Sequence, residues 1–600
     1  MIKALGFFKS YLLRPILFLV VISISLGFNV QAEQASDSVA PEFSTKPSTV
    51  QSSSAKTALA NKFIAVTAHP LATQAAFDVL EKGGSAVDAM VAVQTVLGLV
   101  EPQSSGLGGG AFVLYYDAKQ KKLSTFDARE TAPLKASPEL FMSDDTTPMQ
   151  FFEAVVGGRS VGTPGTVKLL WEMHKLYGKD SWAELLVPAM KLATDGFSVS
   201  QRMAVSIARD QGRLDLDSEA AAYFYPKGQA LQAGSLLKNK AYAQTLQALS
   251  KQGGDHFYQS DISKAIINKV QHSTNKGYLS QEDFHAYKLI QRDAVCMEYH
   301  AFDVCGMGPP SSGSISVNQI LGIVENFDLS KRAHNSPLTW QLISEASRLA
   351  FADRGQYIAD PDFFEVPNGL LNKNYLASRS ELIKTGQANS NISYGIPPDL
   401  KQHNLESGNS PEQESTTHFV IVDNKGNIVS MTSTIENAFG SRLMVKGFLL
   451  NNELTDFSFL PKDNGQLVAN SVEAGKRPRS SMAPTIVFRS NAKGEKVPYL
   501  ALGSPGGSRI INFVANSLIR VLDWNVDLQS AFDSPHIINR FGRMELEQDT
   551  SITKWSKDFQ EMGYPSSEQD INSGLHGVIF KENGMLGAAD KRREGSVKGL

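Results

Sequence analysis

Two β-rich runs joined by a short turn, within residues 414–440, constrain the fold of this chain more than any other feature. Residues 416–423 mix apolar and polar side chains at a period near two, and residues 428–435 form a second run rich in strand-forming residues. The sequence between them is Asn-Lys-Gly, in which the glycine suits a left-handed turn position. The pattern predicts an antiparallel hairpin.

The register of this hairpin brings polar groups together. If Asp423 pairs with Asn427, then Thr416 lies opposite Thr434, with about 4.5–5.5 Å between their Cβ atoms. A bulge at the turn would shift this pairing by one residue. Side chains alternate along a strand, so Thr434 and Glu436 share one face. Two threonine hydroxyls and a carboxylate are therefore expected to converge, although a lone Thr-Thr pair is most often an ordinary part of a strand.

A second motif predicts hydrogen-bond donors at the start of a helix. The sequence of residues 499–508, YLALGSPGGS, predicts a strand that runs into a helix over residues 509–522. Gly506 and Gly507 fall at the first turn of that helix, where backbone N–H groups lack partners. Two such donors suit the oxyanion that forms at an acyl carbon, and a simple tight turn is compatible with the same glycines.

With these motifs the chain resembles the gamma-glutamyltranspeptidase family of N-terminal nucleophile hydrolases, from about Phe63 to the C-terminus. The matching segments occur in the family's order: EPQSSGLGGGA (101–111), TFDARETAP (125–133), ESTTHF (414–419), GFLLNNELTDF (447–457), KRPRSSMAPT (476–485) and YLALGSPGGS. The resemblance implies an α/β (α+β) fold, the four-layer αββα sandwich. Propensity by itself supports only a mixed α/β protein.

The resemblance also implies that the chain cuts itself before Thr416. Cleavage would give a large subunit, residues 57–415, and a small subunit, residues 416–600, which stay associated as a heterodimer. The released α-amine, with a pKa of about 7.7–8.0, can act as a base for the hydroxyl of the same threonine. Thr434 would contact that hydroxyl, and Gly506 and Gly507 would form the oxyanion hole.

The same resemblance implies how a γ-glutamyl group is held. Its α-carboxylate would bind Arg129, Ser480 and Ser481, because the planar guanidinium can grip a carboxylate with two hydrogen bonds. The α-amine would bind the acidic residues Glu436, Glu453 and Asp456.

Some positions depart from the family. Many relatives have Asn at position 436 and Leu where this chain has Arg479, and residues 457–476 lack a tyrosine that some relatives use as a lid. These departures leave the choice of acceptor open.

The predicted function is that of a gamma-glutamyltransferase and glutathione hydrolase. It would pass the γ-glutamyl group of glutathione or a related donor to water, amino acids or peptides, with no metal or organic cofactor. One alternative is a cephalosporin (glutaryl) acylase of the same superfamily, and another is a non-catalytic periplasmic protein that binds γ-glutamyl peptides. A third is a serine hydrolase, because residues 158–162 read Gly-Arg-Ser-Val-Gly with Ser160 at the centre. The glycines at 106–110 follow a helix and precede a strand, the reverse of a dinucleotide site, and favour a close crossing of backbones.

The N-terminal sequence indicates where in the cell the protein is expected to lie. Residues 1–32 have the pattern of a secretory signal peptide, with an uncleaved anchor as the alternative, and residues 33–56 are predicted to be a disordered linker. We therefore expect a periplasmic or secreted protein without stable membrane association. A net charge of −3 provides no electrostatic reason to bind nucleic acid. Cys296 and Cys305 lie on either side of a predicted turn and are either a cross-strand disulfide or two free thiols.

Further elements follow from periodicity. Helices are predicted over residues 61–82, 167–177, 182–194 and 240–251, together with an amphipathic helix over 340–354. Another helix is predicted to begin after Ser85 and to end near Val100. Asp88 lies three residues after Ser85, the spacing of a capping box. Residues 112–116 are predicted to be a strand, and the polar residues 386–415 a loose segment.

Overall fold

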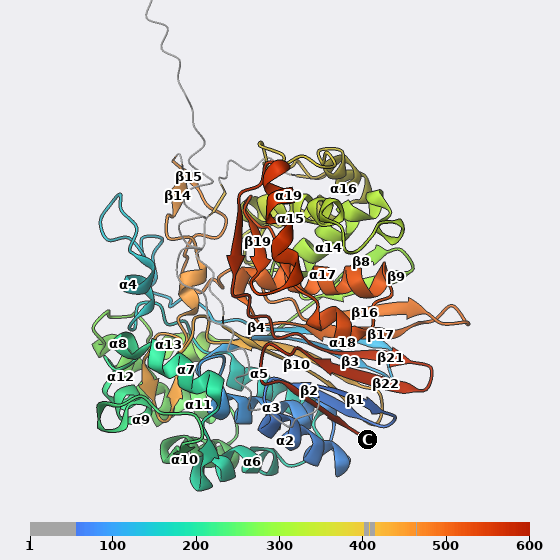
Figure 1. The fold of residues 1–600 in the computed structure, drawn as a ribbon. Coiled ribbons are helices and arrows are strands. Elements are labelled where there is room, and N and C mark those ends of the chain that lie inside the picture. The colour runs from blue at the N-terminus through green and yellow to red at the C-terminus, as the bar shows by residue number, and fades with distance from the viewer. Residues whose placement is uncertain (1–55, 401–406, 409–414, 464) are drawn as a thin grey trace, which may run out of the picture.

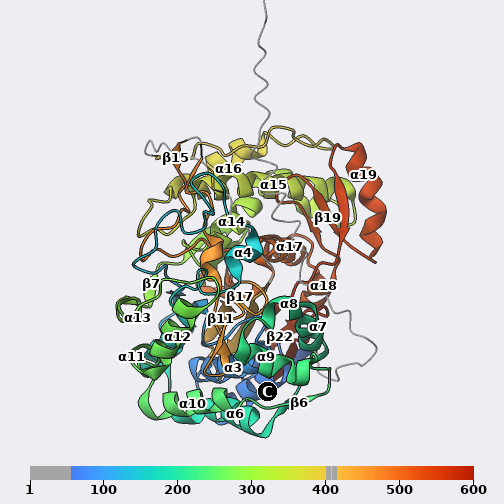
Figure 2. The same ribbon diagram turned by 90° about the vertical axis from the view of Figure 1, so that its left-hand side faces the viewer.

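The computed structural model describes residues 56–400, 407–408, 415–463 and 465–600. Two antiparallel seven-stranded sheets face each other and carry a layer of helices on each outer side, which confirms the four-layer αββα sandwich (Figures 1 and 2). The expected signal peptide and all of the expected linker except Lys56 lie outside the described residues. Within the described part of the chain, no helix combines the length and apolarity needed to cross a bilayer.

The hairpin predicted from the sequence lies at the centre of one sheet. In spatial order the strands of this sheet are β23 (Ser596–Gly599), β2 (Ile64–Thr67), β10 (Thr417–Val422), β11 (Ile428–Thr434), β3 (Gly110–Asp117), β4 (Lys122–Ala128) and β7 (Ile290–Arg292). Thr417 pairs with Ser433, and the Asp423 N–H donates to the Asn427 carbonyl at 3.0 Å. The predicted register is confirmed, without a shift at the turn.

The second sheet contains both cysteines. Its spatial order is β1 (Thr57–Ala60), β22 (Gly584–Ala589), β21 (His576–Lys581), β17 (Lys496–Gly503), β16 (Thr485–Ser490), β9 (Phe302–Gly306) and β8 (Val295–Tyr299). Cys296 and Cys305 are directly opposed on β8 and β9 and form a disulfide. This settles the open choice in favour of the bond.

The two faces of β10 show how the core is divided. Phe419 and Ile421 pack in the cluster formed with the lower helices of Figure 1, which include α2 (Pro70–Glu81), α3 (Ala86–Val100), α5 (Thr166–Tyr177), α6 (Trp182–Asp195) and α10 (Lys240–Gln252). Val420 and Val422 point the other way, into the cluster shared with the second sheet and with α14 (Gly313–Val324), α15 (Pro337–Tyr357) and α17 (Ile510–Leu522). Each fully buried side chain of this kind stabilises the fold by about 1.5–3 kcal/mol. Because both faces are buried, the start of β10 is held firmly.

Most of the predicted elements are confirmed, and two need correction. Residues 61–67 are not helical: β2 pairs there with β10 and β23, and the helix begins only at Pro70. The distant strands decide this, and proline at the first helical turn marks the start. The predicted helix over 340–354 is present within α15 but is not amphipathic, because α14 and neighbouring elements bury nearly all of its faces.

The predicted helix cap at Ser85 and the predicted loose segment are both confirmed where the structure describes them. The Asp88 N–H donates to the Ser85 hydroxyl at 3.1 Å, and the Ser85 N–H donates to the Asp88 carboxylate at 2.8 Å. The described part of residues 386–415 contains no helix or strand, and residues 401–406 and 409–414 of that predicted loose segment lie outside the described residues.

The glycine run before β3 allows two backbones to cross next to the end of β11. A Cβ on Gly108 would lie 2.1 Å from the Leu449 carbonyl oxygen, and one on Gly109 would lie 2.0 Å from the Thr434 carbonyl oxygen. The expected close crossing is confirmed. It brings the segment after Phe448 beside the residues that follow Thr434.

Candidate active site

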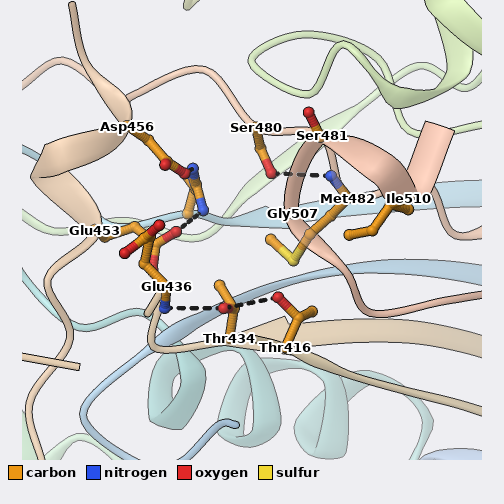
Figure 3. A pocket seen from close by; sticks show the side chains of 11 residues that line it. Thr416, Thr434, Glu436, Glu453, Asp456, Ser480, Ser481, Met482, Gly507 and Ile510 are labelled. Atoms are coloured by element: carbon orange, nitrogen blue, oxygen red, sulfur yellow. Dashed lines mark hydrogen bonds and ion pairs between the residues drawn. The ribbon is translucent and has the colours of Figure 1, made fainter. Parts of the chain in front are cut away.

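A small pocket at the ends of β10 and β11 gathers the predicted site residues (Figure 3). Every predicted residue except Gly506 lines it, and Met482 and Ile510 complete the lining. The lining residues are Arg129, Thr416, Thr434, Glu436, Glu453, Asp456, Ser480, Ser481, Met482, Gly507 and Ile510. The cavity encloses about 20 Å³, enough for roughly one water. A larger cavity of about 740 Å³ lies elsewhere, and none of the predicted site residues lines it.

Thr416 is the first residue of the hairpin and lies at the floor of the pocket. Its hydroxyl donates to Thr434 Oγ1 at 3.1 Å, and the same oxygen accepts the Glu436 N–H at 2.9 Å, as Figure 3 shows. The Thr416 carbonyl accepts from the guanidinium of Arg593 at 3.3 Å. The register of β10 and β11 thus places a second hydroxyl against the candidate nucleophile.

The bond before Thr416 lies in a strained backbone. Thr416 has a φ of +97°, a region that β-branched residues almost never occupy and that costs about 1–3 kcal/mol. The Gly506 N–H donates to the Ser415 carbonyl oxygen at 3.3 Å, while the Ser415 hydroxyl donates to the Gln103 carbonyl at 2.6 Å. A hydrogen-bond donor therefore points at the oxygen of the carbonyl group that the Thr416 hydroxyl would attack.

Gly506 and Gly507 connect β17 to α17, as predicted. Their φ values are +133° and +56°, and a Cβ on Gly506 would lie 2.5 Å from the Phe513 ring. Glycine is required here both for the backbone conformation and for the space. The sharp turn leaves the Gly506 N–H pointing toward the start of β10.

Arg129 follows β4 and pairs directly with two acidic residues. Its two terminal nitrogens contact the carboxylates of Glu453 and Asp456, and it also donates to the Arg479 carbonyl at 2.8 Å. The three side chains are buried, and buried charges are stable only when paired. Burial lowers the pKa of Arg129, but the attraction of Glu453 and then Asp456 outweighs it, and the pKa is raised.

Ser480 and Ser481 also line the pocket, directly after Arg479, whose carbonyl accepts from Arg129. Ser480 Oγ accepts the Met482 N–H at 3.2 Å, a contact drawn in Figure 3. Ser481 Oγ accepts from the guanidinium of Arg354 at 2.9 Å, and Arg354 also donates to Ser312 at 2.8 Å. The sequence pattern did not identify Arg354 as a site residue, because it lies 127 positions from Ser481 within the buried helix α15.

Two more residues next to the pocket were missed. The side-chain amide of Asn452 donates to the Glu436 carboxylate, and this residue lies within the matching segment 447–457, which could have indicated it. Glu130 adjoins Arg129 and is fully buried; burial, followed by the negative charge of Glu453, raises the pKa of Glu130 well above its usual value.

Ser160 does not line this pocket. Its buried hydroxyl donates to the Val155 carbonyl at 2.7 Å, and its own carbonyl accepts the Leu454 N–H at 3.1 Å. These bonds make residues 158–162 a structural turn that supports the segment carrying Glu453. The serine hydrolase alternative loses its nucleophile.

Comparisons with known proteins identify the family. A model of the family described as gamma-glutamyltranspeptidase matches residues 72–600. The chain is 36% identical to the glutathione hydrolase proenzyme of Bacillus subtilis (strain 168), with 89% of this chain and 91% of that protein covered. It is 34% identical to the glutathione hydrolase proenzyme of Escherichia coli (strain K12), with 87% and 89% covered. The crystal structure of a cephalosporin acylase from Bacillus halodurans has a TM-score of 0.79 at 24% identity, covering 91% of this chain and 97% of that one, a likeness of fold. This chain belongs to the gamma-glutamyltranspeptidase family.

Proposed function

We propose that this protein is an autoprocessing gamma-glutamyltransferase and glutathione hydrolase, exported to the periplasm or beyond. The observation that carries the proposal is the charge around the candidate nucleophile. Three carboxylates, those of Glu436, Glu453 and Asp456, line the pocket with one arginine, Arg129. Carboxylates this close together favour the binding of a cation, and the α-ammonium of a γ-glutamyl donor is such a cation.

The first step is maturation. The Thr416 hydroxyl attacks the Ser415 carbonyl carbon, and the C–N bond breaks as the new C–O ester bond forms. Water then hydrolyses the ester, which leaves a carboxylate on Ser415 and a free amine on Thr416. The positive φ of Thr416 and the Gly506 N–H at 3.3 Å from the Ser415 oxygen support this step, because the bond is strained and its oxyanion has a donor ready.

The mature site repeats this chemistry on a substrate. The Thr416 amine accepts the hydroxyl proton as the oxygen attacks the γ-carbonyl, and Gly506 and Gly507 stabilise the oxyanion. The proton passes to the departing amine, and a γ-glutamyl ester of Thr416 remains. Water or the amine of an amino acid or peptide then attacks that ester and restores the hydroxyl. Thr434 holds the Thr416 oxygen in place throughout.

When the donor binds, Arg129 and its acidic partners exchange their ion pairs with each other for ion pairs with the donor. The donor's α-carboxylate takes up the guanidinium of Arg129, with Ser480 and Ser481 beside it. Its ammonium pairs with the carboxylates of Glu453 and Asp456, which Arg129 otherwise neutralises, and with that of Glu436. Every buried charge then keeps an opposite charge, as a buried ionic site requires. Glutathione fits this chemistry as the donor.

A glutaryl acylase remains the second candidate, since a cephalosporin acylase shares the fold. A glutaryl group adds a carboxylate that competes for Arg129 but brings no ammonium group to Glu453 and Asp456. We therefore expect release of the chromophore from a γ-glutamyl anilide to exceed release from the glutaryl anilide by at least tenfold. Equal or reversed rates would favour the acylase, and binding of glutathione without turnover would favour a binding protein.

The maturation step has its own test. Wild-type protein should give two fragments on a denaturing gel, and N-terminal sequencing of the smaller fragment should begin at Thr416. Thr416→Ala should remain a single chain without activity. A normally cut Thr416→Ala protein would rule out this nucleophile.

A further inference from the structure

The loop that carries Glu436 into the pocket is unusually strained. Within residues 436–442 four residues have positive φ: Glu436 at +74°, Phe439 at +63°, Gly440 at +59° and Arg442 at +65°. Only the glycine adopts this region without cost. Such a conformation persists only where the surroundings impose it. Contacts from outside the turn must therefore hold it.

Arg442 supplies these contacts through a single buried guanidinium. One terminal nitrogen donates to the Gly440 carbonyl at 2.6 Å, and the other donates to the Asn437 side-chain oxygen at 2.6 Å. Its Nε donates to the carboxylate of Asp210 at 2.8 Å. Asp210 follows α7 (Gln201–Arg209), more than two hundred positions away, so the turn is closed on itself and tied to another layer of the molecule.

The held turn leads directly to the Glu436 carboxylate. The Asn437 N–H donates to the Asn452 side-chain oxygen at 2.9 Å, and the amide nitrogen of Asn452 donates to the Glu436 carboxylate. The Glu436 N–H donates to Thr434 Oγ1 at 2.9 Å. The backbone conformation of this turn thus decides where the carboxylate of Glu436 lies.

We propose that Arg442 is a positioning residue: together with Asp210 it holds residues 436–442 in the strained turn that aims the Glu436 carboxylate at the donor's ammonium group. The proposal rests on the γ-glutamyl function above and adds to it a determinant of specificity outside the pocket. Relaxation of the turn withdraws Glu436 from the ammonium, while the carboxylate-binding side with Ser480 and Ser481 is unaffected. Arg442 therefore contributes to the discrimination between ligands with and without an α-amino group.

Arg213 provides a matched control. Its Nε donates to the same Asp210 carboxylate at 2.7 Å, and its guanidinium stacks on Phe152, 4.1 Å from the ring centroid. Arg442 lies over the same ring at 5.6 Å. Arg213 is more exposed, with 36% of its side chain accessible, and among the described residues no hydrogen bond or ion pair joins it to residues 436–442. Arg213→Gln removes an Asp210 ion pair and a stacked cation but leaves the turn closed.

The test measures inhibition constants for glutamate and glutarate, which differ by the α-amino group alone, against turnover of a γ-glutamyl anilide. In the wild-type enzyme the inhibition constant of glutamate should be at least tenfold lower than that of glutarate. Arg442→Gln should raise the inhibition constant of glutamate by about fivefold or more and change that of glutarate by less than twofold. Arg442→Lys should behave similarly, because an ammonium cannot bridge these acceptors with the geometry of the guanidinium fork. Arg213→Gln should keep the wild-type ratio.

The double variant separates positioning from general damage. In a Glu436→Gln background the further change Arg442→Gln should have little effect on the glutamate-to-glutarate ratio, since both act through one carboxylate. A ratio that collapses in Glu436→Gln but stays at the wild-type value in Arg442→Gln would overturn the proposal. If Arg442→Gln does not give processed enzyme, Asp210→Asn provides the milder test with the same two criteria. A wild-type enzyme that prefers glutarate would instead overturn the γ-glutamyl function itself.

Discussion

The Gly506 N–H donates to the carbonyl oxygen of Ser415 at 3.3 Å, immediately before the strained residue Thr416. The donor lies in the turn between β17 and α17, and the acceptor lies just before β10, so the bond links the ends of strands from the two sheets. In the proposed reaction the same amide serves twice, first on the chain's own carbonyl and later on that of the substrate.

Gly506→Ala should therefore slow both maturation and turnover. Its new Cβ would lie 2.5 Å from the Phe513 ring and would force the φ of +133° to change, which moves the N–H away. Loss of one oxyanion donor costs about 10²–10³ in rate. A time course on a denaturing gel measures maturation, and kcat of the processed fraction measures turnover.

Gly494→Ala is the control for Gly506→Ala, because this exposed glycine also has a positive φ, +76°, but an added Cβ meets nothing within 4 Å. It should mature and react like the wild type. Equal slowing in both variants would show that backbone strain, and not the loss of the donor, is responsible.

Thr434→Val should lower kcat and should also raise KM, because Thr434 Oγ1 accepts the N–H of Glu436, the proposed ammonium-binding residue. The substitution removes the oxygen that accepts the Thr416 hydroxyl at 3.1 Å and the Glu436 N–H at 2.9 Å. A lost buried hydrogen bond is worth about 1–3 kcal/mol, which is about fivefold to 160-fold in rate. Thr434→Ser keeps the hydroxyl and should retain most activity. A Thr434→Val enzyme with wild-type kcat would remove Thr434 from the mechanism.

Arg129→Lys should raise KM for γ-glutamyl donors by about tenfold to hundredfold, even though the positive charge is kept. The guanidinium contacts Glu453 and Asp456 with separate nitrogens, and a single ammonium cannot reproduce that fork. Steady-state kinetics with a γ-glutamyl anilide provide the measurement. Arg489→Lys, at the far end of β16, should leave KM unchanged. A normal KM for Arg129→Lys would mean that the arginine serves the fold alone.

The mature enzyme should lose stability as the pH falls from about 6.5, the usual pKa of histidine. Burial, and then the charges of Lys56 and Arg593, lower the pKa of His576 to about 3. Between these two values the unfolded chain binds a proton that the folded protein refuses, so stability falls with falling pH by about 1.4 kcal/mol per unit for this group. The melting temperature recorded from pH 7.5 to pH 4 shows the trend.

His576→Leu should lessen this pH dependence, because it removes one of the buried histidines whose pKa is lowered. His285→Gln, a change at an exposed histidine, should leave the curve unaltered. If the melting temperature falls equally steeply with pH in His576→Leu, other groups govern the acid sensitivity.

Features that depend on neighbouring residues were predictable from the sequence. The register that pairs Thr416 with Thr434 follows from a short turn and a period of two, and the cap at Ser85 follows from the spacing to Asp88. The glycines at the start of α17 belong to the same class, because their requirement is set by the local backbone. The family was indicated by the order of the matching segments, and most of the predicted site residues followed from that resemblance.

The tertiary structure decided what depends on distant segments. Residues 64–67 become a strand because β10 and β23 lie on either side, and α15 is buried all round because the fold places other helices against it. The pairing of Arg129 with Glu453 spans 324 positions, and that of Arg442 with Asp210 spans 232. Periodicity and short-range hydrogen bonds act within a few residues and can be read along the chain. Burial of a charge depends on which remote partner the packed layers bring to it, and no local pattern carries that information.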